Sequence, residues 1–245
     1  MNGDSKIVIE SEEIVSFLKR EMKLKELYDS ILSQRAIARA AEERELIVSN
    51  DEIQREADKQ RRQLRLEKAS DTVAWLNEQM VTPEEWETGI RWNLLAQKLA
   101  EEMFGKEVEK FFIQNRSEFE QIILYQIIVA NDKLAQELYF QIEESEVSFY
   151  AAAHEYDIDE SRRQKCGYEG KVYRWQLEPD IASIIFNTSP QQLIGPFRTE
   201  QGYHLFLVEE LIPAELTPKR YQEILNHMFK QWLNIELENL LNYSR

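Results

Sequence analysis

The first half of the chain has the apolar spacing of α-helices. From about residue 12 to residue 118, apolar side chains recur every three or four positions. Two capping boxes, Ser49–Glu52 and Thr82–Glu85, indicate where two of the helices begin, and the second has proline at the first helical position. Gly105 is expected to end the last helix of this half. The pattern predicts a bundle of several helices.

A different pattern begins near residue 121. The run Ile122–Val129 is short, apolar and rich in β-branched residues, so it predicts a strand covered on both faces. The elements expected after it are two helices, a polar loop over 157–169, a short helix over 178–186 and a hairpin strand over 203–208. Residues 121–213 are therefore expected to form a compact α+β domain.

A long helix is predicted after Thr217-Pro218. Its apolar positions alternate between spacings of four and three, and they are Tyr221, Leu225, Met228, Trp232 and Ile235. A stripe with tryptophan and methionine must be buried against another element. We therefore expect residues 214–245 to pack back on a helical domain formed by residues 1–120, with 121–213 inserted between them. The predicted fold class is α+β.

Composition narrows the choice of partners. The chain has 245 residues, of which 43% are hydrophobic and 31% charged, and its formal net charge is −15. This balance argues against nucleic acid or an anionic membrane as the main partner, because phosphate binding needs concentrated lysine and arginine. The acidity serves solubility or, alternatively, favours basic clients. No apolar run is long enough to cross a bilayer, so membrane insertion is not expected.

The remaining single-residue signals exclude several kinds of chemistry. Met1–Glu10 has no signal-peptide pattern, so the chain as given is expected in the cytoplasm, or in the periplasm or another extracytoplasmic compartment if a signal was removed. Cys166 is the single cysteine, so no intramolecular disulfide is expected. The three histidines lack metal-ligand spacing, and they are His154, His204 and His227. We expect neither a metal nor a cofactor.

Three segments of residues 121–213 resemble the parvulin (rotamase) domain. Gln126–Val129 is similar to the family's His-Ile-Leu-Val strand, and Phe149–Tyr156 is similar to its F-x-x-x-A-x-x-Y/H-S helix. Ile194–Leu205 matches G-P-V-x-T-x-x-G-Y/F-H-I almost position by position. The N-terminal helices and the returning C-terminal helix are similar to SurA- and PrsA-like foldases. The resemblance implies a peptidyl-prolyl cis-trans isomerase joined to a helical chaperone domain.

The resemblance also implies a site. Its polar residues would be His204, Thr199, Gln126 and Asp159, and its cup for the proline ring would be Leu177, Ile181 and Phe186. Read without the resemblance, Asp159 could simply cap a turn, and the three cup residues could be ordinary core. Rotation about a prolyl bond needs no nucleophile, because the barrier of roughly 18–20 kcal/mol comes from amide resonance.

Three positions depart from the parvulin pattern. Gln126 replaces a histidine, Ile181 replaces an aromatic residue, and Glu169 replaces a leucine that closes the pocket. Two functions follow. The first is an isomerase and foldase that acts on X-Pro bonds of unfolded or exported polypeptides. The alternative is a catalytically weak, peptide-binding chaperone or export and maturation factor. A purely structural role is the third possibility. In each functional case the expected partners are unfolded or proline-containing polypeptides.

Overall fold

The computed structural model describes residues 9–243. Most of Met1–Glu10, which shows no signal-peptide pattern, therefore lies outside the described residues. The chain divides into two compact units, Met1–Val108 with Tyr221–Arg245, and Glu109–Arg220. Both borders fall inside long helices. The α+β class and the inserted arrangement are confirmed, whereas the borders expected at 120/121 and 213/214 stay predictions.

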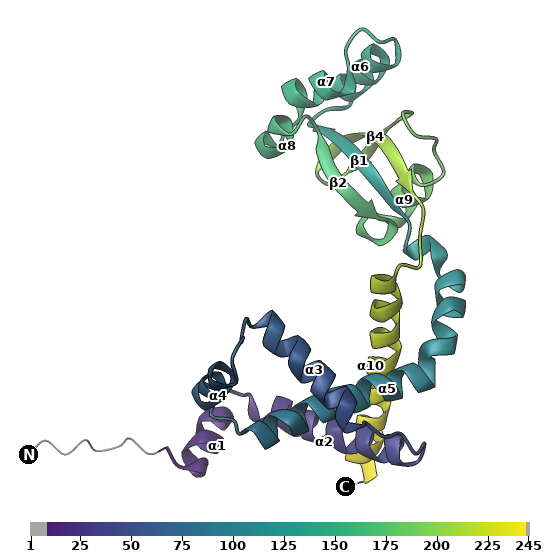
Figure 1. Cartoon of the computed structure of the whole chain (residues 1–245). Coiled ribbons are helices and arrows are strands. Elements are labelled where there is room, and N and C mark those ends of the chain that lie inside the picture. Colours follow the sequence, from purple (N-terminus) through teal and green to yellow (C-terminus); the bar gives the residue numbers. More distant parts are fainter. Residues whose placement is uncertain (1–8, 244–245) are drawn as a thin grey trace, which may run out of the picture. The chain divides into compact units, whose positions relative to one another are not determined.

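The first unit is helical (Figure 1). Its helices are α1 (Ser11–Arg20), α2 (Leu24–Glu42), α3 (Asn50–Gln63), α4 (Ala69–Glu78), the greater part of α5 (Pro83–Gln114) and nearly all of α10 (Pro218–Tyr243). Both predicted capping boxes are confirmed. The Ser49 amide donates to Glu52 over 2.9 Å, and the Thr82 amide donates to Glu85 over 2.8 Å.

Gly105 does not end a helix, because α5 continues to Gln114. Its lack of a side chain allows the close approach of α10. A Cβ at Gly105 would lie 2.6 Å from a carboxylate oxygen of Glu101 and 3.1 Å from the Tyr221 hydroxyl. That hydroxyl lies 2.7 Å from Glu101 Oε1 and 3.2 Å from the Gly105 carbonyl oxygen. The glycine therefore serves packing between helices rather than helix termination.

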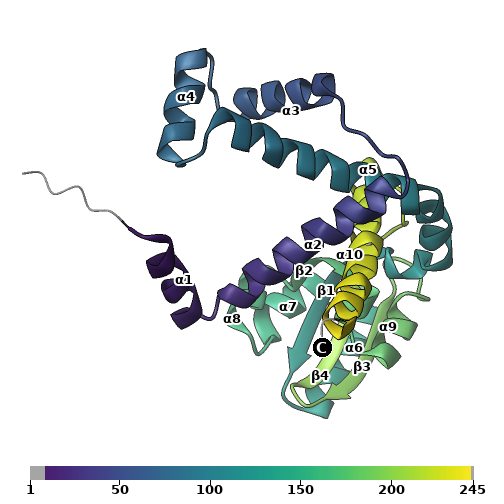
Figure 2. The same cartoon turned by 90° about the horizontal axis from the view of Figure 1, so that it is seen from below.

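Two apolar clusters hold the helical unit together. In the first, α3 runs along the first half of α5 (Figure 2), and the buried residues are Val48, Ile53, Ala57 and Ile90. In the second, Ile37 and Ala40 of α2 meet Leu99 of α5, and α10 covers them with Phe229, Trp232 and Leu233. Trp232 of the predicted stripe therefore packs on the N-terminal helices. Ile235, which the same spacing placed in the stripe, is 58% exposed, so that part of the prediction is wrong.

The second unit contains a four-stranded antiparallel sheet with strand order β2-β1-β4-β3. Its elements are β1 (Gln121–Val129), α6 (Asp132–Glu143), α7 (Phe149–Tyr156), α8 (Glu160–Gln164), β2 (Tyr168–Tyr173), α9 (Pro179–Ile185), β3 (Leu193–Thr199) and β4 (Gly202–Ile212), with short 3-10 turns at Arg116–Glu118 and Arg174–Gln176. The predicted polar loop over 157–169 is wrong in part. It contains α8, and it ends in β2, an edge strand that the pattern did not predict.

The two faces of this sheet carry separate cores. Ile127 and Val129 of β1 pack with α6 and α7 on one face, together with Leu205 and Leu207 of β4. The other face packs on α9 and is lined by Ile122, Leu124, Val172, Ile194, Phe206 and Val208. Because side chains alternate along a strand, Gln126 and His204 belong to the α9 face. The strand predicted over 122–129 is thus covered on both faces, which confirms that prediction.

None of the helices among residues 9–243 combines the length and the apolarity that crossing a membrane requires.

The cover that α10 provides should be measurable in the free energy of unfolding. Trp232 stacks on Phe229 with ring centroids 5.2 Å apart and lies over the cluster of Ile37 and Leu99. Trp232→Ala should lower the free energy of unfolding by about 2–4 kcal/mol, because Trp232 is half-buried. Ile235→Ala on the same helix is the control, since Ile235 is 58% exposed. Equal losses in urea unfolding of the two variants would contradict this packing.

Candidate active site

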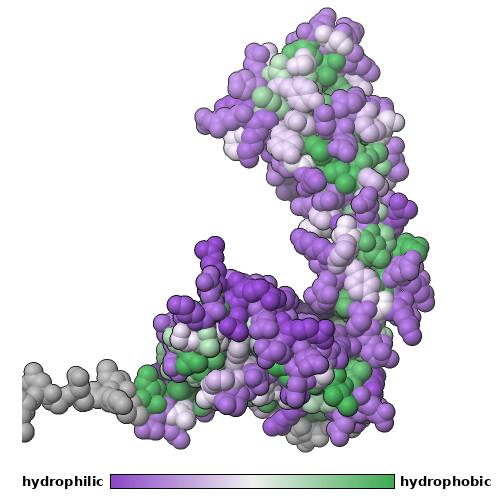
Figure 3. All heavy atoms as spheres, in the orientation of Figure 1, coloured by the Kyte–Doolittle hydropathy of each residue, from purple (hydrophilic) through white to green (hydrophobic). Residues whose placement is uncertain are grey.

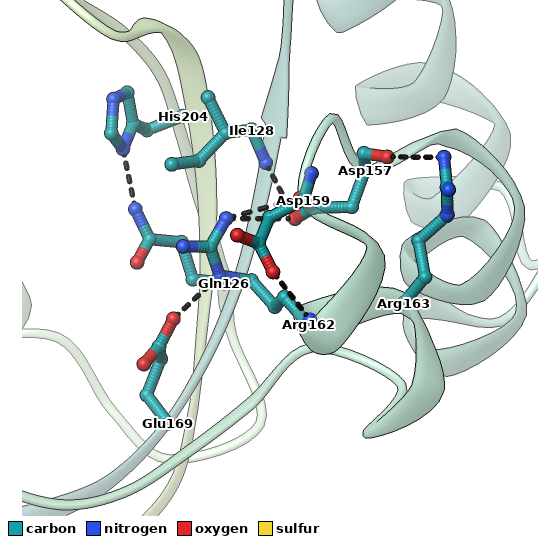
Figure 4. Close-up of polar contacts among 8 residues, drawn as sticks. All are labelled: Gln126, Ile128, Asp157, Asp159, Arg162, Arg163, Glu169 and His204. Carbon is teal, nitrogen blue, oxygen red and sulfur yellow. Dashed lines mark hydrogen bonds and ion pairs between the residues drawn. The ribbon is translucent and has the colours of Figure 1, made fainter.

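A line of three polar side chains crosses the α9 face of the sheet. The Gln126 amide nitrogen lies 2.5 Å from Nδ1 of His204, and Thr199 Oγ1 lies 2.6 Å from Nε2 of the same ring (Figure 4 shows the first contact). When the amide donates to Nδ1, the ring proton is on Nε2 and is donated to Thr199. Thr199 Oγ1 also accepts from the Gln201 amide over 3.1 Å. The Thr199 hydroxyl proton is then free to donate elsewhere.

This line is held in an uncharged form. His204 is only 5% exposed. Burial lowers its pKa below the ordinary value of 6.5, and the positive charge of Arg162 lowers it further. Glu178 and Asp157 oppose this shift without reversing it. Gln126 does not titrate, so near pH 7 the line consists of neutral groups.

Apolar side chains border the polar line. His204 stacks on Phe206, with ring centroids 5.8 Å apart, and Phe206 lies 6.2 Å from Phe197. The three cup residues, Leu177, Ile181 and Phe186, pack on this same cluster, and Phe186 is buried while the other two are half-buried. The guanidinium of Arg174 covers the Phe186 ring at 4.5 Å. The structure therefore brings the predicted cup together beside His204 and adds residues that sequence reasoning missed.

A sequence signal existed for one of these additions. Phe206 is two residues from His204 on the same strand, so strand alternation places both side chains on one face. Phe197 follows the Gly195-Pro196 pair, where the pairing of β3 with β4 shifts register, and simple alternation does not carry across such an irregularity. Arg174 lies in a 3-10 turn without a periodic pattern.

Asp159 lies apart from the polar line. It is the N-cap of α8, where Oδ1 accepts from the Arg162 amide over 2.8 Å, and its side chain is exposed. The carboxylate thus makes the capping contact that residue type alone suggests. Hydrogen bonds join the other three predicted polar residues, Gln126, His204 and Thr199, to one another.

The buried carboxylate of this region is Asp157, two residues earlier and 1% exposed. It accepts from the Ile128 amide over 3.0 Å, from the Asp159 amide over 2.8 Å and from Arg162 Nη1 over 3.0 Å (Figure 4). Asp157 therefore ties the end of β1 to the segment that carries Asp159. Sequence reasoning missed it, because no spacing distinguishes it from its neighbour in a polar segment.

Glu169 completes this charged group. Its carboxylate lies 2.5 Å from Nε of Arg162, so that one arginine bridges Asp157 and Glu169. The position at which the parvulin pattern has a pocket-closing leucine is thus used for an ion pair. The positive charge of Arg162 lies between the carboxylates of Asp157 and Glu169, and it acts on the pKa of His204. Part of the site's border is therefore ionic rather than apolar.

The low pKa of His204 predicts how stability depends on pH. The unfolded chain takes up a proton at this residue near pH 6.5, whereas the folded chain does so only at lower pH. Protonation therefore favours unfolding, and this residue's contribution is complete above pH 6.5 and is lost as the pH falls below it. Urea unfolding at pH 7.5 and 5.5 should show a larger loss for the wild type than for His204→Gln. Equal losses would contradict a lowered pKa.

Removal of the Asp157 carboxylate should be costly. Asp157→Ala leaves two backbone amides and the Arg162 guanidinium without their buried acceptor, so we expect a loss of about 3–5 kcal/mol in the free energy of unfolding. Glu200→Ala, which removes an exposed carboxylate from the turn before β4, is the matched control and should change it by less than about 0.5 kcal/mol. Similar values for the two variants would show that Asp157 does not hold this segment.

Comparisons with known proteins show which domain and which fold this chain resembles. The profile of the Rotamase family, described as the PPIC-type PPIASE domain, matches residues 128–210. A foldase protein PrsA from Caldanaerobacter subterraneus is 25% identical over 202 residues, which are 80% of this chain and 58% of the relative. A chaperone SurA from a Shewanella species is 29% identical over 106 residues, which are 43% of this chain and 24% of the relative. This chain thus spans little more than half of the PrsA relative.

A crystal structure of the peptidylprolyl isomerase PrsA from Bacillus cereus aligns with all of this chain. It covers 100% of this chain and 91% of the PrsA chain, with a TM-score of 0.51 and 14% identity. At that identity the likeness speaks for the fold. Together, the profile and this structure show that residues 128–210 match the PPIC-type PPIASE domain and that the chain shares its fold with PrsA.

Proposed function

We propose that this protein is a peptidyl-prolyl cis-trans isomerase and foldase that acts on X-Pro bonds of unfolded or exported polypeptides. The observation that carries the proposal is the neutral line of Gln126, His204 and Thr199 beside the apolar cluster on the α9 face. The profile match over 128–210 supports it. Exported clients imply an extracytoplasmic place of action.

The proposed reaction is a rotation, so the site has to bind a twisted amide better than a planar one. The proline ring would sit on Leu177, Ile181 and Phe186, which remove it from water. The Thr199 hydroxyl, whose oxygen already accepts two hydrogen bonds, would donate to a carbonyl oxygen of the client. An acceleration of about 10⁵ requires about 7 kcal/mol of transition-state stabilisation. One well-placed hydrogen-bond donor supplies about 2.7–4 kcal/mol of this.

Asp159 has a separate part in this proposal. Its carboxylate caps α8 through Oδ1, and its backbone amide donates to Asp157, so the position of the residue is fixed. We place Asp159 beside the carbonyl of the bound client, where its charge would favour the twisted form.

The weakly catalytic alternative also rests on specific residues. Gln126, Ile181 and Glu169 depart from the parvulin pattern, and Glu169 is held in an ion pair with Arg162 at the site's border. A chaperone that recognises peptides through this domain would need the cup but little turnover.

Two variants of Asp159 separate catalysis from helix capping. Asp159→Ala removes both the charge and the cap, whereas asparagine is an equally good N-cap without charge. On a short X-Pro peptide, kcat/KM should fall at least tenfold in both variants, which corresponds to about 1.4 kcal/mol. Stability should fall only in Asp159→Ala, by about 0.5–2 kcal/mol. Ser148→Ala, which removes the cap of α7, controls for lost stability.

If Asp159→Asn keeps full activity, the charge of Asp159 has no part in catalysis and the residue serves only as the N-cap of α8. Gln126→His should preserve or raise activity, because imidazole can occupy the same hydrogen-bonding position beside His204. If the wild-type protein suppresses client aggregation but isomerises X-Pro bonds no faster than the uncatalysed reaction, the proposal of an isomerase is wrong. The peptide-binding chaperone is then the better description.

A further inference from the structure

A groove lies on the face of the sheet opposite the polar line of Gln126, His204 and Thr199. We call it the rear groove; it has a volume of about 530 Å³ and is bordered by α6, α7 and the start of β3. None of the residues of the proposed isomerase site lines it. Figure 3 shows hydrophobic side chains, in green, at the surface of the end of the second unit that carries α6 and α7 in Figure 1. The apolar side chains of the groove belong to the core of this face or pack against it, and they are Tyr139, Ile142, Val147, Phe149, Leu193 and Leu207.

Acidic residues surround this apolar floor. Glu143 lines the rear groove, and Glu146 lies between two lining residues; both are exposed. Glu209 of β4 accepts a hydrogen bond over 2.8 Å from the hydroxyl of Tyr150, which also lines the groove. The sequence from 134 to 161 contains eight acidic residues and no lysine or arginine. None of the described residues that line the groove is basic, so its floor is apolar and its surroundings are negatively charged.

Tyr150 gives the rear groove an aromatic wall that is held in place. Its ring meets the Tyr125 ring edge-on, with centroids 5.0 Å apart, and the Tyr125 ring lies 5.2 Å from that of Tyr168. Burial and the hydrogen bond to Glu209 raise the pKa of Tyr150 to about 12, so the phenol stays neutral and keeps donating to the carboxylate. Aromatic rings attract cations, and a neighbouring carboxylate adds to this attraction.

These contacts specify the kind of ligand that fits. The apolar floor takes an apolar side chain, and the carboxylates and the tyrosine ring take a lysine or arginine beside it. The volume lies within the range of roughly 300–1,000 Å³ that is usual for binding pockets. Solubility alone would be served by acidic residues on any surface, and it does not account for an apolar floor between them. Charge complementarity therefore favours a cationic polypeptide segment.

We propose that the rear groove is a second polypeptide-binding site, separate from the isomerase site, for segments in which apolar side chains lie next to lysine or arginine. The proposed foldase function supplies such segments as unfolded clients, and the inference rests on it in this respect. The two sites lie on opposite faces of one small sheet. A client held in the rear groove therefore keeps its neighbouring X-Pro bonds at a high effective concentration beside His204. The net charge of −15 then serves recognition at this groove as well as solubility.

Fluorescence anisotropy of a labelled, proline-free peptide tests the specificity of the rear groove in the full chain. A peptide that alternates leucine and lysine should bind, and its affinity should fall as salt is added. A peptide with glutamate in place of lysine and one with glycine in place of leucine should each bind at least about tenfold more weakly. Such peptides contain no X-Pro bond, so their binding is measured whether or not the chain is an active isomerase.

Charge reversal locates the bound peptide. At physiological salt, where the Debye length is about 8 Å, the double variant E143K/E146K should bind the leucine–lysine peptide at least about fivefold more weakly than the wild type. E137K/E155K makes the same change in net charge at exposed residues of α6 and α7 outside the groove, and it should bind within about twofold of the wild type. Both variants should keep the wild-type kcat/KM on a short, uncharged X-Pro peptide.

Four results would overturn the proposal. The first is a wild type that does not bind the leucine–lysine peptide, and the second is equal binding by E143K/E146K and E137K/E155K. The third is displacement of the peptide by spermidine at similar concentration, because the groove would then take small cations rather than polypeptide. The fourth is loss of binding in Asp159→Asn, which would place the peptide in the isomerase site instead.

Discussion

The pairing of β1 with β4 at the centre of the sheet is the interaction on which the rest of the isomerase unit depends. Its register sets Gln126 against Phe206 and Ile128 against His204, so that glutamine and histidine emerge from neighbouring strands on one face. The same ladder separates the two cores. Because α6 and α7 cover one face, the α9 face is where a polar line and an apolar cup occur together. A different register would separate Gln126 from His204 and break the hydrogen bond between them.

The buried charges of Asp157 and Arg162 hold the backbone of this region in place and add little net stability. A buried ion pair recovers little more than the cost of removing both charges from water. The Asp157 carboxylate is useful because it also accepts from Ile128 and Asp159, and so joins β1 to the segment before α8. Arg162 neutralises it, and burial of His204 together with the positive charge of Arg162 keeps the pKa of His204 low. One buried pair thus affects both the geometry of the site and its protonation.

The helical unit depends on a similar long-range contact. α10 returns after the isomerase unit, and Trp232 covers residues from α2 and α5 that are more than a hundred positions away in the chain. The glycine at position 105 lets Tyr221 approach α5 closely enough to reach Glu101.

The sequence by itself determined the features that depend on neighbours along the chain. Capping boxes, helical apolar spacing and the β1 run are local, so they predicted the bundle and the inserted α+β unit. The cup residues were expected only from the resemblance to the parvulin domain. The tertiary structure alone decided the rest. β2 is short and polar and pairs with β1, and Gly105 leaves the space that Tyr221 of α10 occupies. Asp157 is buried and Asp159 is exposed, and burial is a property of the folded chain rather than of residue order.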